Sequence, residues 1–363
     1  MINRVMDIDK AETEMHFSRW SGGRAGVIPR HAEREEHVLS APRNCESAAS
    51  VHSAARAALE TTNCPLCGSD RRRLVVAAAD REALPPQPLF AVVRCRECDL
   101  CYTNPRPGEA EMGRFYYDDY APHQAPPAPP QTAINRSKWR SLIGKRKPNW
   151  LRGEIEPMGQ RRLLDFGCGT GAFLQCMNDL GWQAVGLDNS PRAVKYVLEE
   201  LRLPALAGTL PNAVLPPESF DLVTLWHALE HVHRPLEVLG EVHSLLAPGG
   251  KVLVAVPNIR SAPFRWFGPA WYGLDLPRHL THFTPATLRK MLERSGFEVE
   301  AMQMLRHSYW LRQSAELASR GSAISLPLRL LKFRLPSSVA SKLYLLAGKS
   351  DSFAVMARKK CGA

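Results

Sequence analysis

The stretch at residues 163–174 reads Leu-Leu-Asp-Phe-Gly-Cys-Gly-Thr-Gly-Ala-Phe-Leu. Its apolar beginning predicts a buried strand, and the residues that follow the glycines, Ala172 to Leu180, are compatible with a helix. Three glycines spaced by two let the backbone approach a ligand closely at the free N–H groups of that helix N-terminus. A strand–turn–helix junction of this kind holds a nucleotide-like ligand.

The glycine spacing and one acid narrow the class of ligand. The spacing is GxGxG, whereas dinucleotide-binding turns have GxGxxG. Asp165, on the strand just before the turn, would repel a pyrophosphate but can accept hydrogen bonds from a cationic or hydroxylated group. The turn therefore predicts a cofactor with an amine and a ribose and without a bridging phosphate.

The next hundred residues repeat the order of strand and helix. Gln183–Leu187 is a second short apolar strand ending at Asp188, where an acid can accept both hydroxyls of a ribose. Phe220–Leu225 is typical of a central strand, and Leu246–Val256 of a turn that enters another strand. This alternation predicts a parallel sheet with right-handed crossovers.

These features resemble the class I S-adenosylmethionine (SAM)-dependent methyltransferases. The resemblance lies in four motifs, LLDFGCGTG, VGLDNS, FDLVTLWHALEHV and LAPGGKVLVAVPN. It implies a Rossmann-like α/β fold with a seven-stranded sheet, the three glycines against the methionine part of SAM, and Asp188 on its ribose. Thr209 and Leu210 should lie beside the adenine, and Trp226 at the cofactor rim. The residues that we expect at SAM are Asp165, Gly167, Cys168, Gly169, Gly171, Asp188, Asn189, Thr209, Leu210, Trp226 and His227.

The length and composition of the chain indicate that it consists of several structural parts. At 363 residues the chain exceeds one average domain. No early run resembles a secretory signal, and no apolar stretch approaches the ~20 residues that a membrane span needs. Nine cysteines with two CxxC pairs indicate a reduced compartment, so we expect a cytoplasmic protein. The expected parts are a disordered extension (1–60), a zinc ribbon (61–120), a proline-rich, basic linker (121–150) and a methyltransferase domain (151–363) with a basic helical insertion at about 308–350.

Two CxxC pairs, about thirty residues apart, suit tetrahedral zinc. Cys98 and Cys101 offer an alternative second pair, but Cys95 and Cys98 are preferred because both follow the strand-like Phe90–Val93. Four cysteine ligands leave no open coordination position, so the metal is expected to be structural. The expected ligands are Cys64, Cys67, Cys95 and Cys98.

The arrangement of these cysteines before the methyltransferase motifs resembles bacterial methyltransferases with an N-terminal zinc ribbon. That group includes sugar methyltransferases encoded among polysaccharide-assembly genes. An aromatic cluster at Phe115–Tyr120 follows the cysteines. Aromatic rings serve both domain packing and substrate stacking, and the sequence leaves the two alternatives open.

Methyl transfer to a hydroxyl or carbon acid needs a base, and histidine is the usual one. His227, Glu230 and His231 have the i, i+3, i+4 spacing of one helical face. In the related ubiquinone-pathway O-methyltransferases a similar acidic trio can hold a divalent ion. In this chain the first position of the trio is His227 and not an acid. The favoured interpretation is therefore that these side chains pack around the cofactor, and His231 remains a candidate base.

A second polar group follows the expected fifth strand and reads Asp275-Leu-Pro-Arg278-His279-Leu-Thr-His282-Phe283. In this fold such a loop lies over the carboxyl ends of the strands, where substrate enters. His282 or His279 is therefore the predicted base, and Arg278 is predicted to hold a phosphate or carboxylate of the substrate. The alternative is a loop held in place by its own polar bonds.

The positive charge of the chain, +11 in total, is concentrated in two segments. Residues 131–162 have a net charge of +7 and residues 305–363 of +9, which indicates an acidic partner. Leucines and a phenylalanine alternate with basic residues over Ile324–Leu346, as in a helix lying on an anionic membrane, although packing into the core is the favoured alternative. Peripheral association with the inner face of the membrane is thus one expectation.

Three classes of function remain. The first, which we favour, is methylation of a small-molecule or glycan acceptor at a sugar hydroxyl or carbon, on a nucleotide- or lipid-linked intermediate. The second is methylation of RNA, which is disfavoured because the segment after the fourth strand reads Trp226-His-Ala-Leu229 instead of an Asn/Asp-Pro-Pro-aromatic motif. The third is a non-catalytic SAM-binding scaffold. The oligomeric state does not follow from the sequence.

Overall fold

The computed structural model describes residues 58–82, 88–116, 161–321 and 325–360. These residues belong to one of the two units of the chain, Ala58–Ala363, and every structural statement below concerns that unit. Most of the expected extension over residues 1–60 and all of the expected linker over residues 121–150 lie outside the described residues.

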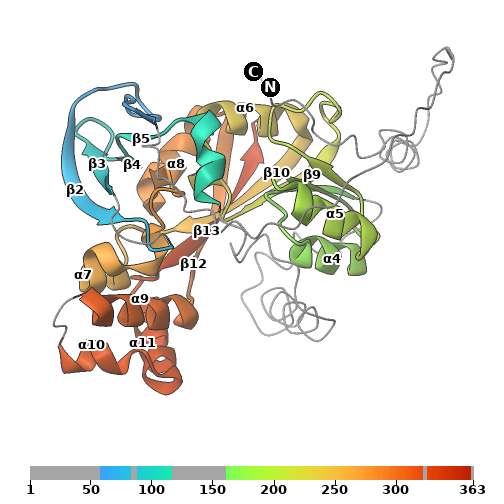
Figure 1. The fold of residues 1–363 in the computed structure, drawn as a ribbon. Coiled ribbons are helices and arrows are strands. Elements are labelled where there is room, and N and C mark those ends of the chain that lie inside the picture. The colour runs from blue at the N-terminus through green and yellow to red at the C-terminus, as the bar shows by residue number, and fades with distance from the viewer. Residues whose placement is uncertain (1–57, 83–87, 117–160, 322–324, 361–363) are drawn as a thin grey trace, which may run out of the picture. The chain divides into compact units, whose positions relative to one another are not determined.

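A seven-stranded sheet forms the centre of the unit, with the order β12-β13-β10-β9-β6-β7-β8 (Figure 1). The strands β6 to β10 run parallel, whereas β13 is antiparallel to both of its neighbours. The seven strands confirm the expected α/β fold, but the sheet is mixed because Ser352 at the start of β13 pairs with Leu305 at the end of β12. The strands are β6 (Arg162–Phe166), β7 (Gln183–Asp188), β8 (Ala205–Ala207), β9 (Phe220–Trp226), β10 (Leu246–Pro257), β12 (Phe297–Leu305) and β13 (Ser352–Lys359).

Four helices pack on this sheet through their apolar stripes. The helices α4 and α5 contact β7, α6 contacts β10, and α8 contacts β12. The side chain of Ser190 accepts a hydrogen bond from the N–H of Ala193 at the start of α5, and the side chain of Thr284 accepts one from the N–H of Thr287 at the start of α8. The helices are α4 (Ala172–Asp179), α5 (Pro191–Glu199), α6 (Pro235–Leu245) and α8 (Pro285–Arg294).

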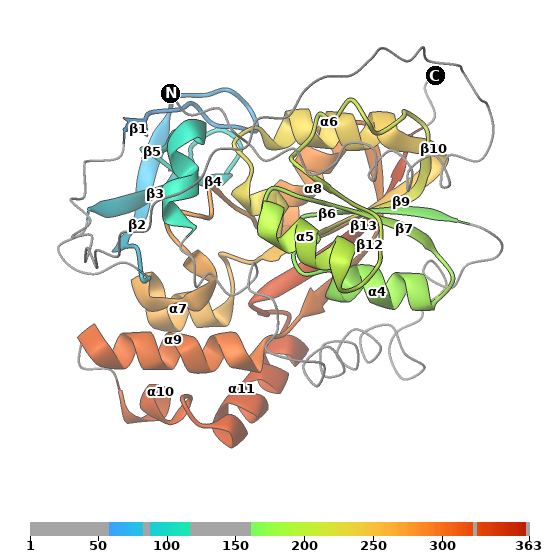
Figure 2. The same cartoon turned by 45° about the vertical axis from the view of Figure 1, so that its right-hand side comes forward.

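Three further helices lie between β12 and β13. The helix α9 packs against α7 on one side and against α10 and α11 on the other (Figure 2). Leu311 and Ala315 of α9 enter a second apolar core together with Trp271 and Tyr344. Among the helices of the described residues, none is long and apolar enough to cross a membrane. The three helices between β12 and β13 are α9 (Ser308–Gly321), α10 (Leu326–Leu330) and α11 (Arg334–Leu346), whereas α7 (Ala262–Phe267) follows β10.

The segment that carries the paired cysteines forms a separate four-stranded sheet of order β11-β4-β3-β2. β2 and β3 pair in antiparallel orientation. The fourth strand, β11, comes from the loop after β10, so a distant part of the chain completes this sheet. Its strands are β2 (Arg72–Ala79), β3 (Leu89–Cys95), β4 (Cys101–Thr103) and β11 (Thr281–His282). β1 (Leu59–Glu60) and β5 (Arg106–Pro107) form a two-stranded sheet of their own. The short 3-10 helices of the described residues include η1 (Glu109–Phe115), η3 (Leu229–His231), η4 (Gly268–Ala270) and η5 (Tyr272–Leu274).

Candidate functional site

The glycine turn lies at the carboxyl end of β6 and leads into α4. Gly167, Gly169 and Gly171 have φ angles of 75°, 51° and 74°, in the left-handed region that favours glycine. The N–H of Gly167 donates to the carbonyl of Leu187 in β7, at 2.7 Å. A Cβ on Gly167 would lie 2.7 Å from the Cβ of Ala228, so the turn packs directly on the segment that follows β9.

Asp188 is buried at the end of β7, beside this turn. One carboxylate oxygen accepts from the N–H of Gly169 and the other from the N–H of Ser190, each at 2.8 Å. These bonds fix the orientation of the carboxylate, and a carboxylate accepts about four hydrogen bonds in all. The arrangement suits a ligand that presents hydroxyl groups at the mouth of the turn.

The other residues expected at the cofactor differ in their surroundings. Asp165 is buried within the sheet, where Thr224 donates to it at 2.7 Å, and burial raises the pKa of its carboxyl to about 7. Cys168 is buried next to Gly186, at which an added Cβ would meet its Sγ at 2.7 Å. Asn189 and Thr209 are exposed, and Leu210 is buried. The roles assigned to these residues remain predictions.

The expected cofactor rim lies between α4 and the helical insertion. Trp226 packs against Phe173 with ring centroids 5.3 Å apart. The next residue, His227, has a φ of 55°, and its ring lies 5.5 Å from that of His307 and 5.3 Å from that of Trp310. The insertion thus contributes side chains to this rim.

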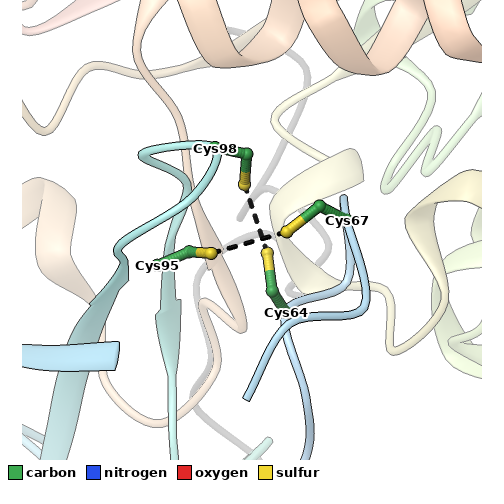
Figure 3. Close-up of side chains that lie close together, drawn as sticks. All are labelled: Cys64, Cys67, Cys95 and Cys98. Atoms are coloured by element: carbon green, nitrogen blue, oxygen red, sulfur yellow. Dashed lines mark hydrogen bonds between the residues drawn. The ribbon is translucent and has the colours of Figure 1, made fainter. Parts of the chain in front are cut away.

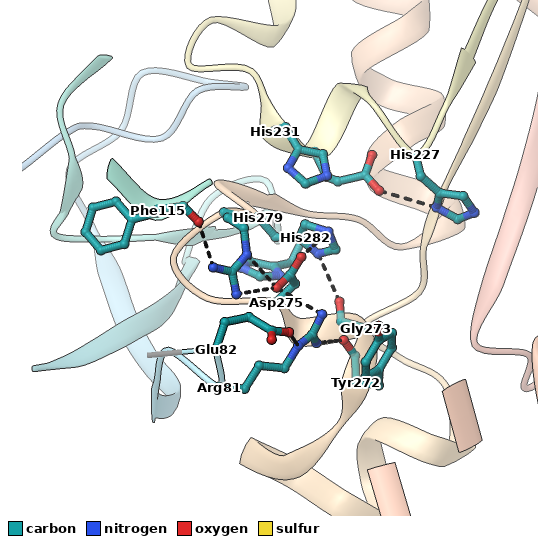
Figure 4. Close-up of polar contacts among 12 residues, drawn as sticks. Arg81, Glu82, Phe115, His227, His231, Tyr272, Gly273, Asp275, His279 and His282 are labelled. Atoms are coloured by element: carbon teal, nitrogen blue, oxygen red, sulfur yellow. Dashed lines mark hydrogen bonds and ion pairs between the residues drawn. The ribbon is translucent and has the colours of Figure 1, made fainter. Parts of the chain in front are cut away.

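Beside the rim, three side chains bring possible ligand atoms within 4.8 Å of one another: Glu230, His231 and His279 (Figure 4). The rings of His231 and His279 meet edge to face, with centroids 4.6 Å apart. Nδ1 of His279 donates to the carbonyl of Gly273 at 3.0 Å, so Nε2 carries the lone pair when the ring is neutral. Nδ1 of His231 lies 3.0 Å from the hydroxyl of Tyr116.

The protonation of this histidine pair is set by burial. Burial lowers the pKa of His231 below 6.5, although the carboxylate of Glu230 opposes the shift. Burial and the neighbouring His231 lower the pKa of His279 further. Both imidazoles are therefore neutral at pH 7, which is the form that can accept a proton.

His282, the other predicted base, lies in β11 on the side of the cysteine-bearing sheet. Its backbone pairs with Cys101 in β4. The hydroxyl of Thr103 donates to the carbonyl of His279 at 2.7 Å and accepts from Nε2 of His282 at 3.1 Å. Burial lowers the pKa of His282 to about 3. This placement favours His231 and His279 over His282 as proton acceptors.

Arg278, predicted to hold a substrate anion, has no exposed side-chain surface. Its guanidinium forms two hydrogen bonds with the carboxylate of Asp80, at 2.8 and 3.1 Å, and a third with Asp275, at 2.9 Å. It also donates to the carbonyl of Phe115. A substrate anion would have to displace one of these carboxylates, so the contacts correspond to the alternative of a loop held by its own polar bonds.

Asp275 is shared between two arginines. Arg81 lies 3.1 Å from the same oxygen that Arg278 contacts. Burial disfavours the charged carboxylate, but the two guanidinium groups outweigh it and hold the pKa of Asp275 well below its usual range. The loop is therefore fixed by charges that remain ionised at neutral pH.

The four paired cysteines converge, with all Sγ atoms within 4.8 Å of one another (Figure 3). Cys64 and Cys98 have their sulfurs 3.4 Å apart, and Cys67 and Cys95 have theirs 3.5 Å apart. Ligands at the usual Zn–S distance in a tetrahedron lie about 3.8 Å apart. The set is thus compatible with a tetrahedral metal ion, while Cys101 lies in β4 outside it.

Sequence reasoning missed three side chains at this site: Tyr116, His307 and Trp310. Tyr116 lies in the aromatic cluster, for which packing and substrate stacking had remained open. The other two are in a segment notable only for its basic charge, and nothing in its local pattern indicates a contact with His227.

Comparison with known sequences matches the chain to methyltransferases. A family model described as a methyltransferase domain matches residues 131–302. A ubiquinone biosynthesis O-methyltransferase of Xanthomonas axonopodis pv. citri is 31% identical over 205 residues, which cover 51% of this chain and 85% of the relative. Its namesake in Xanthomonas euvesicatoria pv. vesicatoria is 29% identical over 208 residues, with the same coverage. A solved SAM-dependent methyltransferase from Archaeoglobus fulgidus has a TM-score of 0.42 and 21% identity, covering 63% of this chain and 94% of that one.

Replacing Arg278 by alanine should lower the free energy of unfolding by about 3–5 kcal/mol, because Asp80 and Asp275 would remain buried without their shared cation. Denaturant unfolding measures the loss. Arg289→Ala, at an exposed arginine of α8, is the matched control and should change stability by less than about 0.5 kcal/mol. Equal effects of the two substitutions would contradict a structural role for the buried ion pairs.

Proposed function

This chain belongs to the SAM-dependent methyltransferases, and we propose that it methylates a hydroxyl or acidic carbon of a sugar on a nucleotide- or lipid-linked intermediate. The observation that carries the proposal is the neutral pair His231 and His279 beside the cofactor rim. A base is needed for an oxygen or carbon acid, whose proton must leave during attack. The relatives reported above are named O-methyltransferases, which supports an oxygen acceptor.

The residues around the glycine turn fit SAM. Gly167 has no room for a side chain, and Asp188 holds an oriented carboxylate at the adjoining strand end. In this proposal the turn lies against the methionine part, and Asp188 accepts hydrogen bonds from the ribose hydroxyls. When bound, SAM supplies a methyl group on a positively charged sulfur, already activated for displacement.

The protein groups then hold the acceptor in line and take its proton. We assign the proton acceptor to Nε2 of His231, with Nδ1–H donating to the hydroxyl oxygen of Tyr116. The carboxylate of Glu230 has no exposed surface and favours the imidazolium that forms. His279 packs edge to face on the ring and holds it in position. This is the logic of a base oriented by neighbouring polar groups.

We propose further that the four cysteines hold one structural zinc ion and that residues 61–120 are a zinc ribbon. Four thiolates complete a tetrahedral shell and leave no position for substrate. The chain resembles sugar methyltransferases in having such a ribbon before a methyltransferase fold. This resemblance supports a sugar as the acceptor.

Asp188→Asn should weaken binding of S-adenosylhomocysteine by about 10- to 100-fold, because the ribose hydroxyls lose a charged partner worth ~1.5–3 kcal/mol. Isothermal calorimetry with the purified chain gives both affinities. Asp179→Asn, at an exposed carboxylate of α4, is the control and should bind as the wild type does. Unchanged affinity of Asp188→Asn would contradict the ribose assignment.

Protein purified without chelator should contain close to one zinc ion per chain by elemental analysis, because such sites bind zinc tightly. Cys67→Ser should lose most of the metal and lower the stability of the cysteine-bearing sheet, while Cys176→Ser, at a buried cysteine of α4 outside the set, should retain it. Less than about half an equivalent in the wild type would count against the site.

With methyl-labelled SAM and a panel of nucleotide sugars, lipid-linked sugars, phenols and rRNA, we expect label on a sugar. His231→Ala and His279→Ala should lower kcat by about 10²–10⁴-fold at unchanged affinity for SAM. His227→Ala should instead weaken SAM binding. Because the base must be neutral and its pKa lies below 6.5, kcat/KM should be constant above pH 7 and fall as the pH drops through that lowered pKa.

The control for these variants is His243→Ala, at a partly buried histidine of α6 that packs on Phe297. Its turnover should match that of the wild type. Wild-type turnover in both His231→Ala and His279→Ala would show that the proposed base is wrong. Label on rRNA and on no sugar would replace the proposed acceptor by RNA.

A further inference from the structure

The helix α11 presents its apolar side chains to the outside of the unit. Leu335, Val339, Leu343 and Leu346 recur at intervals of four, four and three residues, so they share one face of the helix. Their exposed fractions are 76%, 49%, 62% and 85%. A helix on the surface of a soluble domain normally has the opposite arrangement.

The buried face of α11 is polar. Ser337 and Ser341 have no exposed surface, and Arg306 donates to the hydroxyl of Ser341 at 2.9 Å. The hydroxyl of Tyr344, also buried, donates to Asp351 at 2.7 Å. Rotating the leucines inward would leave these buried polar groups without partners, which costs about 1–3 kcal/mol for each. The outward orientation of the apolar face is therefore fixed.

The neighbouring helix α10 extends this apolar area. Leu326, Leu330 and Phe333 are 70%, 46% and 53% exposed. Both α10 and α11 pack on α9, on the side away from α7 (Figures 1 and 2). Together the seven exposed apolar side chains define what we call the α10–α11 surface, and exposed apolar side chains in such number on neighbouring helices indicate an interaction site.

The charged residues of the segment that forms this surface are all basic. Residues 325–349 contain no Asp or Glu. Their five basic residues are exposed: Arg329, Lys332, Arg334, Lys342 and Lys349. Basic side chains that flank exposed leucines and a phenylalanine are the composition of helices that lie in the headgroup region of a bilayer.

We propose that the α10–α11 surface docks on an anionic lipid bilayer, with its apolar side chains among the acyl chains and its cations at the headgroups. A second copy of the chain would place five cations against five, which disfavours self-association. A bilayer that contains anionic lipid matches both the apolar and the charged side chains. The proposal concerns the location of the enzyme and does not depend on the identity of the acceptor.

The test is flotation of the full-length chain with lipid vesicles. The wild type should float with vesicles that contain phosphatidylglycerol and stay behind with vesicles of pure phosphatidylcholine. Raising the salt concentration should weaken the binding because it screens the headgroup charge. Absence of flotation with phosphatidylglycerol at low salt would overturn the proposal.

The double variant Leu335→Asn/Leu343→Asn should bind at least about tenfold less lipid, because two inserted side chains are lost. Leu74→Asn/Leu89→Asn is the matched control, since these leucines are 65% and 69% exposed but lie in β2 and β3. It should float as the wild type does. Both double variants should bind S-adenosylhomocysteine normally, which shows that they are folded.

Two results would refute the docking surface. Equal flotation of Leu335→Asn/Leu343→Asn and the wild type would show that other residues bind the lipid. A wild type that is dimeric by light scattering and does not float, together with a monomeric Leu335→Asn/Leu343→Asn variant, would assign the surface to a second copy of the chain.

Discussion

The buried guanidinium of Arg278 is the contact on which the arrangement of the site depends. It joins carboxylates that are distant in sequence, Asp80 after β2 and Asp275 in the loop after β10. Burying such charges costs several kcal/mol per ion, and the cost is offset only when each charge meets a partner in good geometry. Each of these charged groups can be buried because the oppositely charged groups beside it compensate its loss of water.

This ion-pair network determines where the loop after β10 can lie. With Asp275 and Arg278 fixed, the chain continues as β11 along β4 and completes the cysteine-bearing sheet. The N–H of Leu280 donates to the carbonyl of Glu230 at 2.7 Å, which ties the loop to η3 as well. The cysteine-bearing sheet is thus part of the wall that positions His279 against His231, and its contribution to the site is structural.

The parts of the site that are formed by residues close together in the sequence could be predicted. The glycine turn and Asp188 could be predicted from short strand–turn–helix patterns. The convergence of the cysteines could be predicted from two short motifs. The partners of Arg278 could not be predicted, because Asp80 is 198 positions away and no periodicity links the two. The contact of Tyr116 with His231 spans 115 positions and was hidden for the same reason.

The orientation of α11 is a second feature that could not be predicted from the sequence, for a different reason. Leucines and serines occur on opposite faces of this helix, and the usual rule that leucines face inward predicts packing into the core. In the structure the serines face inward because Arg306 supplies a hydrogen-bond partner from another element. Which face of an amphipathic helix is buried therefore depends on the partners that the tertiary structure offers.

Burial has opposite outcomes for two neighbouring sets of groups at this site. Asp275 remains ionised because Arg81 and Arg278 supply compensating charge, whereas His231 and His279 meet no buried anion strong enough to keep a proton. Environments that separate the protonation states of adjacent groups are the usual way in which a fold assigns a base at neutral pH. Nε2 of His279 lies 3.8 Å from Asp275, too far for a hydrogen bond, and this carboxylate raises the pKa of His279 by less than burial and His231 lower it. In the proposed mechanism, burial beside this ion-paired loop keeps the histidine pair in the neutral form that can take the proton of a methyl acceptor.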